Sequence, residues 1–570
     1  MKKQKMSPNP SLTTHGNNCF RDKNYKQALK YYKLALNKID RTTSLDSSNM
    51  SNTSSLSKKS ALTNQEKAKL YQNMSAVYKR LKKYPECLEN AIYALEIDSG
   101  YEKAWKVVQE ILKMKNTSTN NDNEDIDQQL SIKFSKFELL VNIMACVIYF
   151  KLNDSELKKK ANQYLNKLCL DTSEIIYKDK IINRLPSFKF ITNHLSLFED
   201  FSNCLFYKIL KSHGDDYEYF EKLFEQFVVV DKNGVVEENK KVNNQLSDDL
   251  ENSPNTKLLI QGTLAILSSN FKTAVNMFET YLKDQASGDA SGDARNETES
   301  SQIIYANIQL AISYSHLKEL QKANSYYKKA ISLNPNCSAA YYQRAQLNLS
   351  LNEYQNSLND FSQAFSIEVE NAKKRNAAET ENSDTQYSKT AGRAAAYKNY
   401  LYWQSAFISD DTDKVNEALN NFKLDLEKFN FQNSSEYLGL YAQAAQSTKS
   451  ENNTNNKLAH KLYDQCYQAD TSICTALVHK ANLLHTSGDS LEAINILVDV
   501  VNNIDSKNEF AYESIATIYK AAENFPEAIK YYEKAIECSK SKGEVFEYSE
   551  EVFRLKAFIE IKRKFGLEMP

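Results

Sequence analysis

Small and aromatic residues recur at helical spacings along most of the chain. In one segment Ala311 is followed by Tyr327 and Ala330, with apolar residues three and four positions apart between them. The same three positions return 34 residues later (345 − 311 = 34) as Ala345, Phe361 and Ala364. A period of this length predicts pairs of antiparallel helices that stack on one another.

Further copies of the pattern lie toward both ends of the chain. If Ala311 is numbered position 8, small residues recur at positions 8, 20 and 27 and an aromatic or Leu at 24, as in a tetratricopeptide repeat. Small residues let two helices approach closely, and the larger residue fills the space to the next pair. We therefore predict an all-α fold, a right-handed tetratricopeptide superhelix (α-solenoid) in two modules with about nine to eleven helix pairs. The copies include Gly16, Ala28, Tyr32 and Ala35; Ser75, Ala91 and Ala94; Ala481, Ala493 and Leu497; and Ala516, Ala528, Tyr532 and Ala535.

Polar segments rich in Asn and Ser interrupt the repeats, and their low hydrophobicity predicts disordered loops. The period is lost between about residues 155 and 250, which marks a boundary between modules. The predicted loops are 41–64, 116–131, 238–256, 284–302, 369–390 and 448–456. The predicted domains are a disordered basic N-terminus (1–10), an N-terminal module (11–180), an inter-module helical segment (181–250) and a C-terminal array (251–570) that ends in a long helix.

Composition excludes several classes of protein. The 72 Lys and Arg residues balance 73 Asp and Glu residues, which argues against nucleic-acid binding. Nine scattered cysteines without a Cys-x-x-Cys pair indicate reduced core residues, and the seven histidines show no metal-ligand spacing. No catalytic or nucleotide-binding motif occurs, so we expect neither an enzyme nor a cofactor. The longest apolar run, 139–150, is shorter than the ~20 residues of a membrane span, so we expect no membrane anchor in this sequence.

The repeat frame predicts which polar side chains face the concave side of the N-terminal module. They include Asn17, Asn73 and Lys103, two amides and an ammonium that could hold a peptide's C-terminal carboxylate. This set resembles the dicarboxylate clamp with which co-chaperones hold the Glu-Glu-Val-Asp tails of the 70- and 90-kilodalton heat-shock chaperones. Two cationic positions of that clamp are Thr13 and Val107 here. The sequence leaves open a weakened clamp, a groove that no longer binds chaperones, or amides that only cap local backbone.

Several segments, in this order, carry a more specific resemblance: 185–201 between the modules, then 341–346, 440–446, 476–484 and 509–536. From about Gly16 to Leu567 the layout resembles the family of 70-kilodalton receptor subunits of the mitochondrial outer-membrane translocase. The resemblance implies a receptor that takes hydrophobic preproteins, such as metabolite carriers with internal targeting signals, from cytosolic chaperones and passes them to the translocase. Family members carry an N-terminal membrane anchor, which implies a place on the cytosolic face of the outer membrane of mitochondria or a related organelle.

The resemblance also implies a precursor-binding groove in the C-terminal array, and the repeat frame nominates residues for it. A lining of apolar and amide side chains suits broad, weak recognition of hydrophobic segments. Arg344 is equally well explained as a structural partner of a neighbouring helix. The nominated residues are Ile308, Ile312, Tyr342, Arg344, Gln346, Leu349, Val478, Asn482 and His485. The alternative to an import receptor is a soluble cytoplasmic co-chaperone or assembly scaffold that uses the same helices to join partners.

Overall fold

The computed structural model divides the chain into two compact units, which are described separately. Unit 1 comprises residues 1–176 and 519–570, and unit 2 comprises residues 177–518. The structure describes residues 11–46, 53–114, 126–151, 156–176, 198, 201–212, 229–230, 236–237, 254–267, 270–287, 297–378, 387–449, 453–471, 474–539 and 541–568.

Unit 1 is built of helices that pair along the chain. Helix α1 packs on α2, α3 on α4, and α5 on α7, as consecutive antiparallel partners. Its elements are α1 (Leu12–Arg21), α2 (Tyr25–Asp46), α3 (Thr53–Arg80), α4 (Tyr84–Ile97), α5 (Glu102–Lys113), α6 (Ile126–Ser131), α7 (Lys136–Tyr149), α8 (Glu156–Ile176), the end of α25 (Glu509–Ala521), α26 (Phe525–Cys538) and α27 (Lys542–Phe565).

The ends of these helices follow from local sequence. Ser135 caps α7 through a reciprocal capping box with Glu138, which satisfies two backbone N–H groups. Ser541 and Glu544 make the same arrangement at the start of α27. Gly566 ends α27 in the left-handed conformation, φ 61°, which glycine adopts without steric cost.

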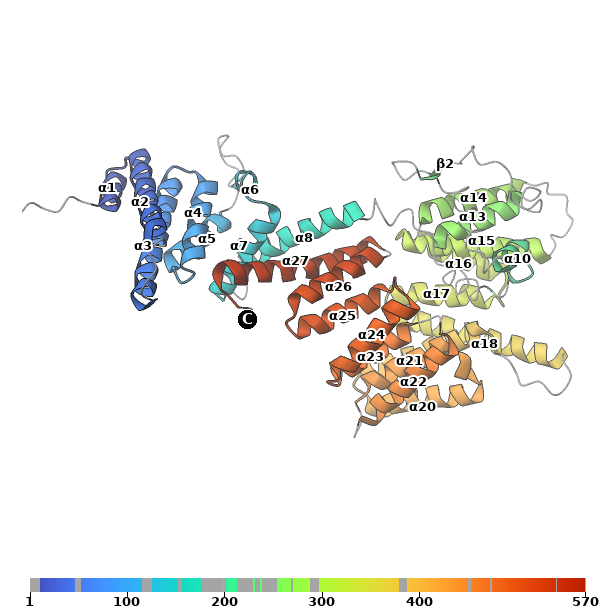
Figure 1. The fold of residues 1–570 in the computed structure, drawn as a ribbon. Helices are drawn as coiled ribbons and strands as arrows, with labels where there is room; N and C mark the ends of the chain where they lie inside the picture. Colours follow the sequence, from blue (N-terminus) through green and yellow to red (C-terminus); the bar gives the residue numbers. More distant parts are fainter. Residues whose placement is uncertain are drawn as a thin grey trace, which may run out of the picture. The chain divides into compact units, whose positions relative to one another are not determined.

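The last helix of the chain packs into the core of unit 1. Helix α27 lies beside α7 and α8 (Figure 1), and the ring of Phe565 contacts that of Trp105 with centroids 5.2 Å apart. Trp105 in turn stacks on Tyr149 at 4.6 Å, and its side chain is fully buried. Lys564 also pairs with Glu96 of α4, 3.8 Å apart. The sequence grouped residues 251–570 in one array, whereas the contacts group residues 519–570 with the N-terminal helices.

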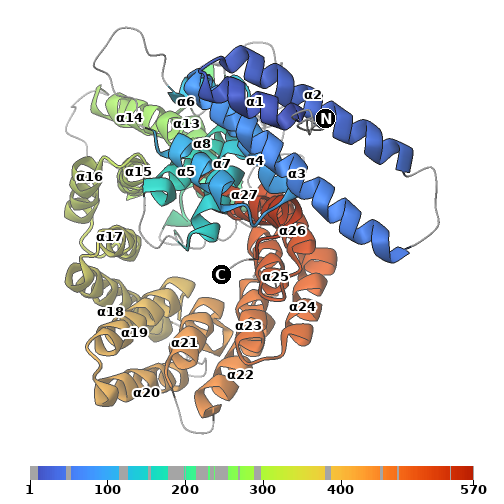
Figure 2. The same ribbon diagram turned by 90° about the vertical axis from the view of Figure 1, so that its left-hand side faces the viewer.

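Unit 2 is a curved array of helix pairs. Figure 2 shows α15, α17, α19, α21 and α23 along the inner side of the curve and α16, α18, α20, α22 and α24 along the outer side. We call the first set the inner face. The elements are α10 (Leu205–Ser212), β1 (Val229–Val230), β2 (Val236–Glu237), α13 (Pro254–Leu267), α14 (Phe271–Ser287), α15 (Glu297–His316), α16 (Leu320–Leu333), α17 (Ser338–Ser350), α18 (Tyr354–Ala378), α19 (Lys389–Ile408), α20 (Thr412–Lys428), η3 (Phe431–Asn433), α21 (Ser435–Ser447), α22 (Thr454–Ala469), α23 (Thr475–Thr486), α24 (Ser490–Asp499), the π-helical turn η5 (Val500–Ile504) and the start of α25.

The predicted fold class is confirmed. The part of the chain that the structure describes is helical apart from an antiparallel ladder in which Val229 lies opposite Glu237 and Val230 opposite Val236. The repeat positions that sequence assigned to helix packing are buried, including Ala311, Tyr327 and Ala330. Small and aromatic residues at this period therefore form the cores between helices.

The predicted polar loops are wrong at their edges, because helices continue into them. Helix α2 extends to Asp46 and α3 begins at Thr53, within the predicted loop 41–64. Helix α18 likewise runs to Ala378, inside the predicted loop 369–390. Polar residues such as Lys, Glu and Ser are compatible with a helix whose other residues already form it, so low hydrophobicity alone does not mark where a helix ends.

Part of the predicted inter-module segment packs on unit 2. The rings of Phe198, Phe201 and Phe206 surround the fully buried Tyr305 of α15, with centroids 5.4, 5.3 and 4.3 Å from it. These three rings belong to the same buried core as Tyr305, so this part of the segment contributes to the packing of α15. Most of residues 177–250, and the predicted N-terminus 1–10, lie outside the described residues. Among the described helices, none combines the length and apolar character needed to cross a membrane.

Candidate functional site

The two amides nominated in unit 1 lie together. Asn73 of α3 donates a hydrogen bond from Nδ2 to Oδ1 of Asn17 on α1, at 3.3 Å. The same oxygen accepts a 2.8 Å hydrogen bond from the hydroxyl of Tyr32. Among the described residues no hydrogen bond from the Asn17 amide nitrogen accompanies these two contacts, so its two N–H groups can still donate. We call Asn17 and Asn73 the amide pair.

The ring of Tyr32 packs directly against the backbone of Gly16, which has no side chain to block it. A Cβ atom on Gly16 would lie 2.5 Å from Cε1 and 2.7 Å from Cδ1 of Tyr32, so the ring occupies that space. The Tyr32 ring is 2% exposed, and burial together with the nearby Cys19 raises the pKa of its hydroxyl. The phenol therefore stays protonated and acts as a donor to Asn17.

The third nominated clamp residue is Lys103 of α5. Lys103 is exposed in the first turn of α5, and no hydrogen bond or ion pair within the described part of unit 1 joins it to Asn17 or Asn73. Lys106, the cation nearest to Val107 in sequence, pairs with Glu102 of its own helix at 2.5 Å. Both partners are mostly exposed, so the pair is weak and its lysine exchangeable.

A cation outside the predicted site residues links two of these helices. Lys79 of α3 pairs with Glu110 of α5, Nζ to Oε2, at 2.5 Å. In the repeat frame Lys79 falls at position 12 and Glu110 at position 9, which are concave-facing positions. The residue types and frame could have suggested it, but only the structure shows the contact.

Three of the nominated groove residues in unit 2 are buried. Ile308 is fully buried, Tyr342 is 6% exposed and Val478 is 4% exposed. The Tyr342 ring packs edge-on against Phe361 at 5.4 Å, so it serves the contact between α17 and α18. Neighbouring helices cover these positions, because adjacent inner helices pack against one another as well as facing the curve.

Arg344 is engaged within its own helix pair. Its Nε and NH2 groups donate to Oδ2 and Oδ1 of Asp360 at 2.8 and 2.7 Å, a bidentate ion pair. Asn348 also donates to Asp360, at 3.1 Å. Hydrogen bonding to Asp360 raises the pKa of Arg344 above its usual value. Of the two interpretations of Arg344, this geometry matches the structural one.

The remaining nominated residues are half-buried on inner-face helices. Ile312 packs against the core around Tyr305, and Leu349 packs against the core around Tyr342. Gln346 donates to the Tyr342 hydroxyl at 3.3 Å. His485 shares a 2.8 Å hydrogen bond with Ser490. Asn482, also half-buried, lies on α23 one turn before His485.

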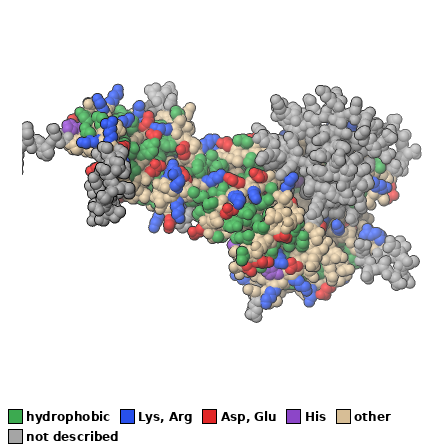
Figure 3. All heavy atoms as spheres, viewed as in Figure 1, with side chains coloured by type: hydrophobic (Ala, Val, Ile, Leu, Met, Phe, Trp, Pro, Cys, Tyr) green, Lys and Arg blue, Asp and Glu red, His purple; other side chains and the backbone are tan. Residues whose placement is uncertain are grey.

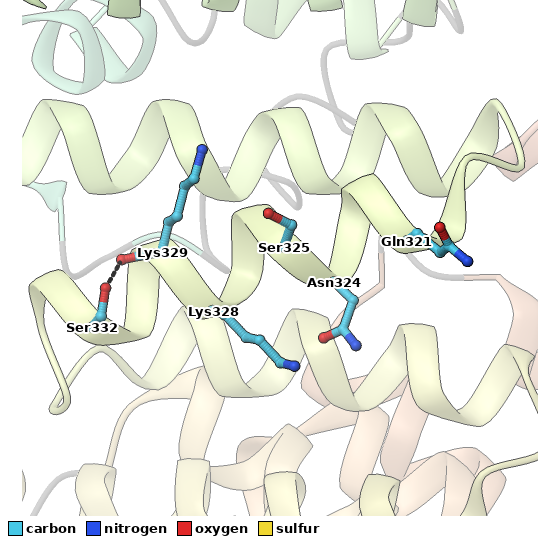
Figure 4. A pocket seen from close by; sticks show the side chains of 6 residues that line it. All are labelled: Gln321, Asn324, Ser325, Lys328, Lys329 and Ser332. Carbon is cyan, nitrogen blue, oxygen red and sulfur yellow. Dashed lines mark hydrogen bonds between the residues drawn. The ribbon is translucent and has the colours of Figure 1, made fainter.

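An open, shallow hollow of about 550 Å³, lined by residues with polar ends, lies on the outer helix α16. Figure 4 shows the side chains that line it, all from one helix, with Ser332 donating to the backbone oxygen of Lys329 at 2.8 Å. The groove residues predicted from the sequence in unit 2 all lie on inner-face helices, so this hollow is not among the predicted sites. The lining residues are Gln321, Asn324, Ser325, Lys328, Lys329 and Ser332.

The cysteines lie mainly in the cores between helices. Eight of the nine are buried, as predicted for core residues, whereas Cys19 is half-buried. Burial raises the pKa of Cys169 and of Cys466 to about 12, so both remain thiols at neutral pH. Within the described ranges no group of three or more His, Cys, Asp or Glu side chains is arranged to hold a metal ion. Acidic and basic side chains are interspersed over the surface seen in Figure 3.

Comparisons with known proteins agree with the repeat pattern. The tetratricopeptide repeat family model matches residues 304–337 and 511–541. Human mitochondrial import receptor subunit TOM70 is 22% identical over 573 aligned residues, covering 97% of this chain and 80% of the relative. The mouse subunit is also 22% identical, with the same shares covered. A crystal structure of yeast Tom70 aligns over 98% of this chain and 97% of its own, at 17% identity and a TM-score of 0.37.

Proposed function

We propose that this chain, which is similar to TOM70 import receptor subunits over 97% of its length, is itself a mitochondrial import receptor. It binds hydrophobic preproteins of the carrier type, with internal targeting signals, and passes them to the translocase of the outer membrane. It works on the cytosolic face of that membrane. The observation that carries the proposal is the end-to-end sequence similarity, because a repeat array alone is shared by proteins of many functions.

The inner face of unit 2 is the proposed precursor-binding surface. Ile312, Gln346, Leu349, Asn482 and His485 are half-buried there and supply apolar and hydrogen-bonding groups. Apolar side chains can contact a hydrophobic segment, while amides can bond its backbone without reading its sequence. Such a lining favours weak binding of many precursors over tight binding of one.

The amide pair of unit 1 is the proposed docking site for chaperone tails. When the oxygen of a side-chain amide already accepts hydrogen bonds, the nitrogen of the same amide is a suitable donor to a peptide's C-terminal carboxylate. Lys103, exposed in α5, supplies a cation on the same series of first helices. The absence of side-chain cations at Thr13 and Val107 lowers the expected affinity, since each charge-assisted bond contributes about 1.5–3 kcal/mol.

Fluorescence anisotropy on the purified chain tests both surfaces. A labelled carrier-derived segment should bind, and Gln346→Ala with Asn482→Ala should weaken that binding several-fold while helicity is retained. The matched control is Asn324→Ala with Lys328→Ala on the outer helix α16, which should leave the affinity unchanged. Carrier binding no tighter than that of a polar segment of the same length and net charge would contradict the receptor proposal.

The chaperone arm has its own readout. A peptide ending in Glu-Glu-Val-Asp should bind more tightly than its C-terminal amide, and Lys103→Ala should weaken the free acid a few-fold. Raising the salt concentration should weaken the acidic peptide much more than the carrier segment, because only the former depends on charge. Equal affinity for acid and amide would show that the groove does not hold the terminal carboxylate.

A further inference from the structure

The ion pair between Lys79 and Glu110 lies on the same series of helices as the amide pair. Asn17 and Asn73 join α1 to α3, and Lys79 and Glu110 join α3 to α5. Helices α1, α3 and α5 are the first members of three consecutive pairs. All four side chains therefore bridge first helices, which are the helices that line the concave side of a tetratricopeptide array.

The spacing along α3 sets the axial part of the distance between the two contacts. Lys79 lies six residues after Asn73 (79 − 73 = 6), which corresponds to about 9 Å along the helix axis, and the two side chains reach neighbouring helices on opposite sides of α3. An extended peptide advances about 3.3 Å per residue, so it needs at least about three residues to cover this distance. A peptide with its terminal carboxylate at the amide pair thus brings a side chain about three positions upstream within reach of the Lys79 ammonium.

We propose that Lys79 determines specificity for a second, upstream carboxylate of the bound tail, and that Glu110 occupies that carboxylate's place in the free protein. The inference rests on the proposed binding of acidic chaperone tails at Asn17 and Asn73. Binding then exchanges one ion pair for another: the ligand's carboxylate takes the Lys79 ammonium, and Glu110 turns to solvent.

The exposure of the pair makes this exchange feasible. The Lys79 side chain is 34% exposed and that of Glu110 is 51% exposed, so both charges stay hydrated when the contact opens. Pairs of this kind contribute little to folding, and a ligand can displace one partner without a large penalty. Lys79 also supplies a cation to a groove in which Thr13 and Val107 provide none.

Glu110 has a second effect on an acidic ligand. While Glu110 remains in place, its negative charge repels an incoming carboxylate and neutralises the Lys79 ammonium. Removing this charge without removing Lys79 should therefore strengthen binding. A gain of affinity is a useful readout because a variant that misfolds cannot produce it.

The test combines two variants with three peptides in anisotropy titrations. The peptides end in Glu-Glu-Val-Asp, in Gln-Gln-Val-Asp, and in Glu-Glu-Val-Asp with an amidated terminus. The unmodified chain should prefer the first peptide over the second, and Lys79→Met should remove this preference by weakening only the first, about three- to tenfold. Glu110→Gln should tighten the first peptide about two- to fivefold and leave the second unchanged.

A matched pair elsewhere in unit 1 provides the control. Lys136 of α7 and Asp171 of α8 are also 2.5 Å apart and are 48% and 56% exposed. Lys136→Met and Asp171→Asn should leave all three affinities unchanged. If the chain binds free acid over amide but Lys79→Met keeps the preference for Glu-Glu over Gln-Gln, the role of Lys79 is overturned while carboxylate docking stands. If acid and amide bind equally, both proposals fall.

Discussion

The ring of Tyr32 occupies the space that a side chain at Gly16 would need, and its hydroxyl then reaches the Oδ1 atom of Asn17 at 2.8 Å. The same exclusion recurs in unit 2, where a Cβ atom on Gly262 would lie 2.6 Å from the ring of Phe278. Both glycines precede their aromatic partner by 16 residues (32 − 16 and 278 − 262). One packing rule of the repeat thus also orients a residue of the candidate site.

Gly16→Ala should destabilise unit 1 by about 1–3 kcal/mol, because the added methyl group forces the buried Tyr32 ring to move. Urea denaturation followed by circular dichroism measures the change. Adding Tyr32→Leu should restore part of the lost stability, since a smaller side chain frees the space. Independent, additive effects of the two substitutions would contradict the proposed clash.

Gly439→Ala is the corresponding control within α21. Its nearest neighbour for an added Cβ is Sγ of Cys466 at 3.7 Å, an ordinary contact. The substitution should stabilise unit 2 by about 0.5–1 kcal/mol through the higher helix propensity of alanine.

Tyr32→Phe should keep the packing and remove the hydroxyl that holds Asn17. We expect a loss of about 1 kcal/mol in stability and a several-fold loss of affinity for peptides with a free acidic C-terminus. Binding of carrier segments, measured in the same anisotropy assay, should not change. Acidic-peptide affinity equal to that of the unmodified chain would mean that the amide pair needs no support from Tyr32.

Phe565→Ala should cost unit 1 about 3–5 kcal/mol, because it removes a buried ring that contacts Trp105. The chain has two tryptophans, Trp105 in unit 1 and Trp403 in unit 2, so a Trp403→Phe background makes the fluorescence report on unit 1 alone. The emission of Trp105 should shift to the red and its denaturation midpoint should fall. An unchanged midpoint would mean that α27 adds nothing to the stability of the N-terminal helices.

His479 should make unit 2 less stable in mild acid. It stacks on Tyr463 with centroids 5.9 Å apart, and burial lowers its pKa below the usual 6.5. As the pH falls below 6.5 the unfolded chain takes up the proton first, so the stability present at higher pH is lost. His479→Gln should reduce the drop in urea midpoint between pH 7.5 and pH 5.5 by a measurable part. An identical drop in both proteins would contradict this contribution.

The repeat period predicted the fold because it records contacts between neighbours in sequence. Ala345 and Phe361, for example, are buried in one small core with Tyr342, as position 8 and position 24 of a single repeat. The amide pair also followed from the frame, since both residues sit on first helices at groove-facing positions. Each of these relations spans one or two repeats, so periodicity is sufficient to find it.

Other features depend on contacts that no period encodes. The frame gives the direction of a side chain from its helix, but not how far the next helix covers it, and Tyr342 and Val478 are buried for that reason. The sequence likewise allows Arg344 to be either a structural partner of a neighbouring helix or a ligand contact, and its ion pair with Asp360 of α18 matches the first role. The contact of Trp105 with Phe565 joins residues 460 positions apart (565 − 105), beyond the reach of any local pattern.

The position of α27 has a consequence for synthesis on the ribosome. Domains generally fold as they emerge, beginning with the N-terminal one. Here the core around Trp105 lacks Ala557, Ile561 and Phe565 until the last helix has left the exit tunnel, so unit 2 can complete its core before unit 1 does. A nascent chain that stalls before α27 has emerged would expose apolar surface on α5 and α7, and so would attract the cell's holding chaperones there.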